Sequence, residues 1–363
     1  HLPHFVPAIE KSLPLHIPLI GTIFPLENFG VKSLAIAIIA VITIANYLSV
    51  KAGNAIQLVS TIMKAAALLL LVAGILFFGH GHWSNLVTNA PSFHPSTWLL
   101  VGSFAAATTG AFAAYDGWNS LPMMAGEIRD PARNIPKSLM IGVASCICIY
   151  VLVTLAYLYV LPVDVMARSP LVASDAIRPV MGSTGNLVIS VLIIVCTFGA
   201  ASANLLANAR VIFAMAETKS FFAWTGVIHR RFRTPGNAVL VLGVWSSLFV
   251  LSGSFDILAD MFVFMSWVFY ALVVIGLFRL RKHRPTASRP YRVTGYPWLP
   301  AIFVAFTAFY LVLTVRYDID NYRHGKSPFI NSIFGMLLTA IGIPLFFYFK
   351  IRSRSLQQNS KRD

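Results

Sequence analysis

Residues 97–122 read TWLLVGSFAAATTGAFAAYDGWNSLP, and this stretch decides the fold. Residues 97–115 carry no charged side chain. Crossing a hydrocarbon core about 30 Å thick takes roughly 20 mostly apolar residues in a helix, because every backbone polar group must be paired internally. Asp116 and Gly117 then follow, with Pro122 soon after, and a continuous helix disfavours all three in its interior. The stretch therefore predicts a membrane-spanning helix that is interrupted near Tyr115.

The composition of the whole chain supports the same class of protein. Of 363 residues, 57% are hydrophobic and 11% are charged, and the mean hydropathy is +0.73. A soluble domain has roughly twice that charged fraction, about 25%. We therefore predict an all-α membrane protein. The apolar blocks predict nine spans, at residues 34–50, 53–79, 98–124, 137–161, 184–218, 236–252, 255–280, 298–316 and 328–350.

The formal net charge of +15 raises the alternative of nucleic-acid binding. The charges, however, are distributed by side of the membrane. If the first span runs inward, 19 of the 28 Lys and Arg residues fall in one set of loops and seven in the opposite set. Such a bias is the positive-inside pattern of membrane proteins. We therefore expect a multi-pass protein of the plasma membrane, in contact with membrane lipid, with a cytoplasmic C-terminus and no nucleic-acid partner.

These spans define three regions of the chain. Residues 1–33 are expected to form an outer loop, residues 34–350 a transmembrane domain, and residues 351–363 a polar cytoplasmic tail. A second long outer loop is expected at residues 163–183. The chain starts with His1 on the predicted outer side, with no signal peptide before the first span. The expectation is therefore that upstream helices are missing.

Signals for enzymatic or metal chemistry are poor. All nine histidines lie outside the expected spans, and no nucleophile-elbow, phosphate-loop or zinc-protease motif occurs. Cys146, Cys148 and Cys196 lie inside spans without metal-ligand or disulfide-framework spacing. We therefore expect no enzyme activity, no cofactor and no metal site.

The interruption near Tyr115 has two interpretations. A helix broken at membrane depth leaves carbonyl and amide groups unpaired, and transporters use such groups to bind substrates and ions. Alternatively, the helix is only kinked and a neighbouring residue satisfies Asp116. The sequence alone leaves both open.

Lys64 is the second polar feature expected at membrane depth. It lies about eleven residues from the inner end of its span, which is deep for the side chain to reach the membrane surface. A buried ammonium needs a partner, a lowered pKa or water. It is therefore either a fixed charge in place of a coupling cation, a titrating group, or a structural lysine bonded to carbonyls. Ser202 fits helix packing as well as a site, whereas Tyr150 is mostly a packing candidate.

Several motifs resemble those of a known family. Residues 110–119 read GAFAAYDGWN and residues 126–136 read GEIRDPARNIP. They resemble the sixth helix and the following inner loop of the L-type amino-acid transporters, with one extra alanine here. Shorter matches are SVKA at 49–52 before the helix with Lys64, CTFG at 196–199, and Arg210. The resemblance covers essentially the whole chain and is greatest to bacterial exchangers of the alanine–serine–cysteine and serine/threonine type.

The resemblance implies a fold and a set of site residues. The nine spans would be helices four to twelve of a leucine-transporter-like inverted-repeat fold, with the first three helices missing. Lys64 would take the place of a sodium ion. The interrupted helix would offer carbonyl groups to the substrate ammonium, and Tyr150 and Ser202 would face the same cavity. The implied substrate-binding residues of the interrupted segment are Phe112, Ala113, Ala114, Tyr115, Asp116 and Gly117.

The resemblance also implies a function. We expect sodium-independent exchange of small neutral L-amino acids by alternating access. One alternative is a proton-coupled symporter in which Lys64 or Asp116 titrates, and another is a non-transporting sensor or scaffold derived from a transporter. The glycine-rich break of the family's first helix has no counterpart in the chain, so half of the implied site is expected to be absent. Eukaryotic members join a glycoprotein through a cysteine in the loop before helix four. Residues 1–33 contain none, so no disulfide-linked heavy subunit is expected.

Overall fold

The computed structural model of the chain describes residues 15–17, 21–23, 28–48, 50–87, 97–123, 125–169, 171–252, 255–289, 291–325, 327 and 330–359. Most of these residues are helical. The helices are α2 (Phe29–Leu48), α3 (Val50–Phe78), α4 (Thr97–Ala114), α5 (Ser120–Met123), α6 (Pro131–Val160), α7 (Val163–Arg168), α8 (Val172–Glu217), α9 (Gly236–Ser252), α10 (Phe255–His283), α11 (Trp298–Arg323), α12 (Asn331–Ala340) and α13 (Gly342–Asn359). Short 3-10 helices are η1 (Trp83–Leu86), η2 (Ala125–Glu127) and η3 (Ala223–Gly226).

The lengths and composition of these helices confirm a helical membrane protein. Seven of the described helical segments are long and apolar enough to cross a membrane, and Gly236–Leu251 is a shorter apolar helix. Seven of the nine predicted spans each fall on one long helix, whereas 98–124 covers α4 and α5, and 328–350 covers α12 and the start of α13. Large apolar side chains cover the outside of the bundle, among them Leu70 at 72% and Phe77 at 82% exposure. Such a surface is costly in water and is suited to lipid.

Three regions predicted to lie outside the spans contain regular secondary structure. Within residues 1–33, β1 (Leu15–Ile17) and β2 (Gly21–Ile23) form an antiparallel pair, and α2 already starts at Phe29. The predicted outer loop 163–183 is largely helical, as α7 and the start of α8, with a kink at Gly182 (φ 58°, ψ −142°). The predicted tail 351–363 continues α13 as far as Asn359, and residues 360–363 lie outside the described residues.

The charges of α7 explain why its helix could not be recognised in the predicted loop 163–183. Asp164 lies in its first turn and Arg168 in its last turn. Both positions are favourable for the helix dipole, which attracts acids at the N-terminus and bases at the C-terminus. The charges that suggested a loop are therefore those of helix ends. The predicted span 328–350 also differs in detail, because α12 and α13 meet at Ile341.

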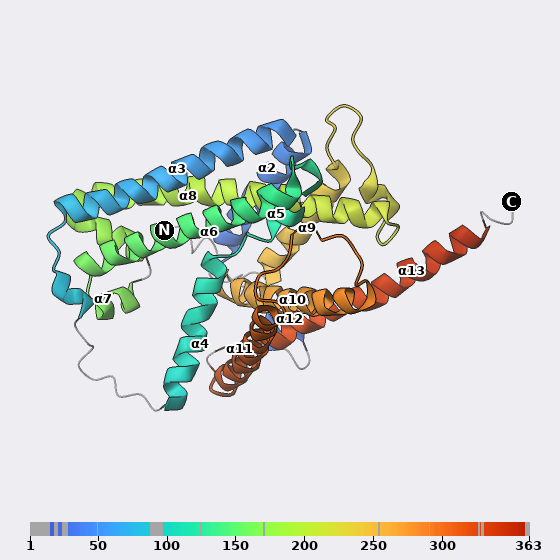
Figure 1. The fold of residues 1–363 in the computed structure, drawn as a ribbon. Helices are drawn as coiled ribbons and strands as arrows, with labels where there is room; N and C mark the ends of the chain where they lie inside the picture. The colour runs from blue at the N-terminus through green and yellow to red at the C-terminus, as the bar shows by residue number, and fades with distance from the viewer. Residues whose placement is uncertain are drawn as a thin grey trace.

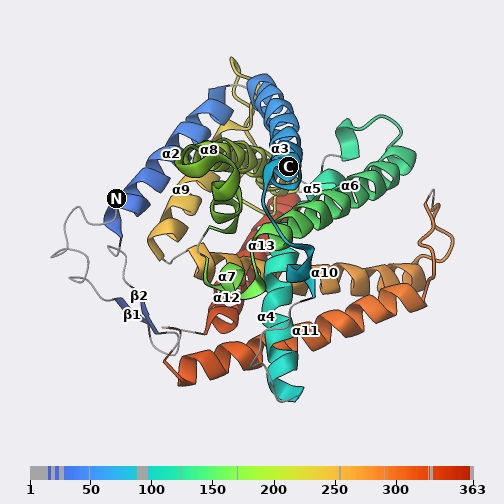
Figure 2. The ribbon, with the colours of Figure 1, turned by 90° about the vertical axis from the view of Figure 1, so that its left-hand side faces the viewer.

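The helices pack in two groups, which Figures 1 and 2 show from two directions. One group contains α2, α3, α6, α8 and α9, and the other contains α4, α10, α11 and α12. Helix α4 packs against α10 and α11, whereas α5 packs against α8 and α6. The chain therefore passes from one group to the other between α4 and α5.

The approach of α3 and α8 depends on small residues. A Cβ atom at Gly199 of α8 would overlap the side chain of Ser60 on α3, so glycine allows the two backbones to come this close. Further along, a buried apolar cluster joins α3, α6 and α8. Its buried members are Leu71, Val72, Ile75, Ala156, Ala176, Ile177 and Ile189. This packing fixes the position of Lys64, which lies between the two contacts on α3.

Candidate functional site

The predicted interruption of the helix is confirmed at the end of α4. Helix α4 ends at Ala114, residues 115–119 form turns, and α5 resumes at Ser120. Gly117 has φ +116°, a conformation that L-residues with a Cβ rarely adopt. The Asp-Gly pair thus ends the helix because glycine permits a backbone path that a helix-forming residue resists.

The interruption changes the hydrogen bonds of the backbone. The amide of Asp116 donates to the carbonyl of Ala113 at 3.3 Å, three residues back, instead of to the carbonyl of Phe112. The Phe112 carbonyl therefore loses the donor that a continuous helix would supply. Two residues further, the carbonyl of Ala114 accepts a hydrogen bond from the phenol of Tyr150 at 2.9 Å. At the break, the Phe112 carbonyl is therefore released from the helix, and the Ala114 carbonyl is bonded to Tyr150.

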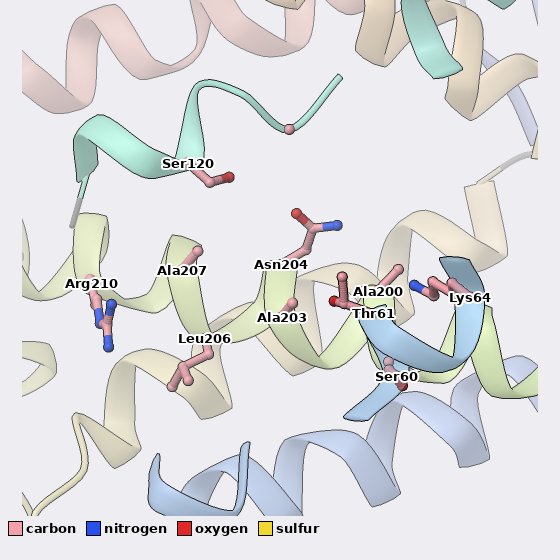
Figure 3. A pocket seen from close by; sticks show the side chains of 12 residues that line it. Ser60, Thr61, Lys64, Ser120, Ala200, Ala203, Asn204, Leu206, Ala207 and Arg210 are labelled. Atoms are coloured by element: carbon pink, nitrogen blue, oxygen red, sulfur yellow. The ribbon is translucent and has the colours of Figure 1, made fainter. Parts of the chain in front are cut away.

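Lys64 and the break share a cavity of about 260 Å³ between α3, α5 and α8. Figure 3 shows the Lys64 side chain extending from α3 toward Thr61 and Ala200, with Ser120 of α5 on the opposite wall. The side chain of Lys64 is half-buried. Its ammonium makes no hydrogen bond or ion pair with any residue that the structure describes. The lining residues are Ser60, Thr61, Lys64, Gly117, Ser120, Gly199, Ala200, Ala203, Asn204, Leu206, Ala207 and Arg210.

A second cavity, of about 470 Å³, adjoins the first and is mostly apolar. It also contains Lys64, with Leu71, Tyr157 and Leu192 among its lining residues. Lys64 therefore lies at the boundary between a polar and an apolar space. The walls of both cavities include hydroxyl groups, those of Ser60, Thr61 and Ser120 in the first and those of Tyr157 and Thr197 in the second.

Asp116 lies on the other side of the break. Its carboxylate accepts the phenol of Tyr270, from α10, at 2.7 Å. Both residues line a separate cavity of about 230 Å³ whose wall is mostly aromatic. Ring centroids lie 3.9 Å apart for Phe112 and Trp267, and 4.9 Å apart for Trp118 and Tyr270. The helix is broken and Asp116 also has a neighbouring partner, so each earlier interpretation holds in part.

The structure brings together most of the predicted residues. The segment from Phe112 to Gly117 forms the break, and the ring of Tyr150 lies 5.0 Å from that of Tyr115. Ala113 and Ala114 have exposed side chains at the end of α4. Gly117 faces the Lys64 cavity, whereas the side chains of Phe112, Tyr115 and Asp116 line the aromatic one.

Ser202 does not join them. It is buried on a different face of α8, where its hydroxyl accepts the side-chain amide of Asn46 on α2 at 3.0 Å. It is absent from the wall of the Lys64 cavity, to which α8 contributes Asn204 instead. Here Ser202 ties α8 to α2, which is the packing interpretation of this residue.

Sequence reasoning missed Tyr270 and Ser120. Tyr270 stands in an apolar run, where a tyrosine is usually explained by packing. Ser120 follows the break directly and was not distinguished from loop residues. The requirement of a buried carboxylate for a donor could have pointed to a partner for Asp116, although not to Tyr270 in particular.

The sequence of the chain is similar to those of known amino-acid transporters. A family model described as amino acid permease matches residues 17–340. The serine/threonine exchanger SteT of Bacillus subtilis is 28% identical over 96% of this chain and 76% of its own length. The mouse b(0,+)-type amino acid transporter 1 is 28% identical over 78% of the chain and 57% of its own length. The mouse Asc-type amino acid transporter 1 is 27% identical over 87% of the chain, which spans 57% of that relative.

Proposed function

The chain belongs to the amino acid permease family, and we propose that it exchanges small neutral L-amino acids across the plasma membrane, without sodium, by alternating access. The observation that carries this proposal is the Lys64 cavity, in which a half-buried ammonium stands across from a broken helix. The names of two relatives, a serine/threonine exchanger and an Asc-type amino acid transporter, support it.

The break supplies groups that suit the substrate ammonium. The Phe112 carbonyl lacks its helical donor and is therefore an available acceptor. Carbonyl groups released from a broken helix bind cations because their dipoles are not compensated by an amide. We propose the segment Phe112–Gly117 as the half of the amino-acid site that lies on this chain's broken helix. Tyr150 holds the Ala114 carbonyl and so fixes the direction of the segment.

Lys64 supports independence from sodium. Two unit positive charges 4 Å apart repel by about 4 kcal/mol at an effective dielectric constant of 20. A sodium ion in the cavity would meet that repulsion, since the described residues offer the Lys64 ammonium no compensating carboxylate. The fixed charge instead substitutes for the ion. Exchange then needs no coupling cation.

The position of the break between the two helix groups supports alternating access. Helix α4 moves with α10 and α11 if the groups rock, whereas α5 moves with α6 and α8. The turns at residues 115–119 are the connection that absorbs such a motion. A substrate held at these turns is then exposed to either side in alternation.

Proteoliposomes test the proposal. Vesicles with the purified full-length protein are loaded with labelled serine, and efflux is followed with and without unlabelled serine outside, in sodium-free buffer. We expect efflux to depend on outside amino acid. Efflux that ignores the outside solution, or that requires sodium, would overturn the proposal.

Two further measurements separate the alternatives. Accumulation of serine into empty vesicles under an imposed proton gradient would establish proton-coupled symport instead. Binding of labelled serine without any flux would establish a sensor or scaffold.

We also propose that no heavy subunit is disulfide-linked, because the chain's three cysteines lie in α6 and α8. A band shift in non-reducing electrophoresis of the native membrane would contradict this.

A further inference from the structure

The loop between α8 and α9 presents an unusual combination of exposed side chains. Arg230, Arg231 and Arg233 are all exposed within four residues. Trp224, Val227 and Ile228, which precede them, are each more than half exposed. The loop projects beyond α9 toward the same side of the view as the C-terminus (Figure 1). It therefore lies on the face that the charge distribution assigns to the cytoplasm.

This loop is held in one conformation by its own backbone. The amide of His229 donates to the carbonyl of Thr234 at 2.9 Å, and the amide of Arg233 donates to the carbonyl of His229 at 2.8 Å. Arg233 adopts φ +54°, which closes the turn. The Nδ1 atom of His229 accepts the amides of Arg231 at 3.3 Å and Phe232 at 3.4 Å. Residues 229–234 thus form a closed turn that displays the three guanidinium groups.

The closed turn is also anchored to the helices. The Thr234 hydroxyl donates to the carbonyl of Tyr47 at 2.7 Å, and the Tyr47 ring lies 5.5 Å from that of His229. Asn237 donates to the carbonyl of Trp224 at 2.7 Å, which ties the apolar part of the loop to α9. The loop is therefore preorganised, and binding a ligand costs little ordering entropy.

The charge of the loop is uncompensated. No Asp or Glu occurs between Glu217 and Asp256 in the sequence. The three arginine side chains make no hydrogen bond or ion pair with any described residue, and Arg231 only approaches the ring of Phe232, at 5.6 Å. By contrast, in the α10–α11 loop the Arg289 guanidinium donates to the carbonyls of Pro285 and Arg284. The α8–α9 loop thus keeps its guanidinium groups available.

We propose that residues 224–233 form a binding site for the headgroup of an anionic phospholipid of the cytoplasmic leaflet. Guanidinium groups match phosphate oxygens in geometry and charge. Trp224, Val227 and Ile228 enter the interfacial layer beside the headgroup, where tryptophan is favoured. A lipid satisfies both halves of the loop at once, whereas a free phosphate contacts only the arginines.

Fluorescence quenching of Trp224 tests the site locally. The protein is placed in nanodiscs that contain brominated phosphatidylglycerol or brominated phosphatidylcholine, and the signal of W224F is subtracted. We expect stronger quenching by phosphatidylglycerol. The preference for phosphatidylglycerol should disappear in R230Q/R231Q/R233Q. Each arginine removed should weaken binding of the anionic lipid about fivefold. Equal quenching by both lipids, or an unchanged preference in this variant, would overturn the proposal.

The matched control changes the same charge on the same face. The variant K282Q/R284Q/R292Q removes three exposed basic groups at and after the end of α10. We expect it to retain the preference, and its loss there would show a general surface charge effect instead of this site. If the loop triple variant does not fold by size-exclusion chromatography, the single variants R230Q and R231Q give the same readout. Competition by inorganic phosphate at equal concentration would also contradict a lipid site.

Discussion

The phenol of Tyr270 donates a 2.7 Å hydrogen bond to the carboxylate of Asp116, across the boundary between α10 and the interrupted helix. The same carboxylate belongs to the segment that joins α4 to α5, and those two helices pack in different groups. The pair therefore ties the break to the α4, α10, α11 and α12 group. On the opposite side of the break, Gly117 faces Lys64.

Removing the Tyr270 hydroxyl should loosen this connection. In Tyr270→Phe the ring contacts with Trp118 and Trp267 remain possible, but Asp116 loses its donor. A hydrogen bond to a charged group is worth about 1.5–3 kcal/mol, so we expect a lower melting temperature in detergent. The exposed Tyr317→Phe is the matched control and should melt like the parent protein.

The double variant decides whether the two residues act as a pair. If they do, the double variant Asp116→Asn/Tyr270→Phe should lose less stability than the two single variants together. The coupling in the free energy of unfolding should be about 1 kcal/mol or more. Additive changes in the free energy of unfolding would show that the hydrogen bond between Tyr270 and Asp116 makes no contribution to stability.

Lys64 should be required for exchange. In Lys64→Ala the cavity between α3, α5 and α8 loses its only charge from α3, and we expect serine exchange to fall at least about tenfold, or about 1.4 kcal/mol. Lys282→Ala, at an exposed position in the last turn of α10, should exchange normally. A Lys64→Ala protein with full sodium-independent activity would refute the proposed role of this lysine. Gain of sodium dependence would support it.

The sequence predicted the spans well, because long apolar blocks leave few structural alternatives in a membrane. It also predicted the break, since Asp116 and Gly117 oppose a helix through chemistry that is local to the chain. The orientation of Ser202 could not be predicted in this way. Ser202 and Asn204 are both polar residues of α8, and the sequence does not indicate which of them faces α2 and which faces the cavity.

Contacts between distant elements were also beyond the sequence. Tyr270 and Asp116 are far apart in the chain, and their contact depends on how α10 packs against α4. The helix α7 was missed because the charges at its two ends resemble those of a loop. Features that depend on neighbouring residues in the chain, such as the break, were therefore predictable. The face that each helix turns to its neighbours, and which helices those neighbours are, could not be predicted.

Gly199 should be sensitive to the smallest enlargement. A methyl group in Gly199→Ala would overlap the Ser60 side chain, including its Cβ, which cannot rotate away. Overpacking of this kind costs about 1–3 kcal/mol, so we expect a lower melting temperature and a partial rescue by Ser60→Gly. Gly276→Ala in α10 is the control, since nothing lies within 4 Å of its added Cβ. An unchanged Gly199→Ala protein would contradict the close contact of α3 and α8.

Gly117 tests whether the shape of the break matters for transport. Its φ of +116° is strained for any residue with a Cβ, although no neighbour lies within 4 Å of an added Cβ. Gly117→Ala therefore changes backbone preference without a clash, at a cost of about 1–3 kcal/mol for the observed turn. We expect serine exchange to fall about tenfold or more, if the turn is what positions the acceptor carbonyls. Gly142→Ala, at an exposed position of α6 and equally free of neighbours, should exchange like the parent protein. Initial exchange rates in sodium-free proteoliposomes measure both, with the amount of folded protein checked by size-exclusion chromatography. Normal exchange by Gly117→Ala would show that the geometry of residues 115–119 is not part of the substrate site.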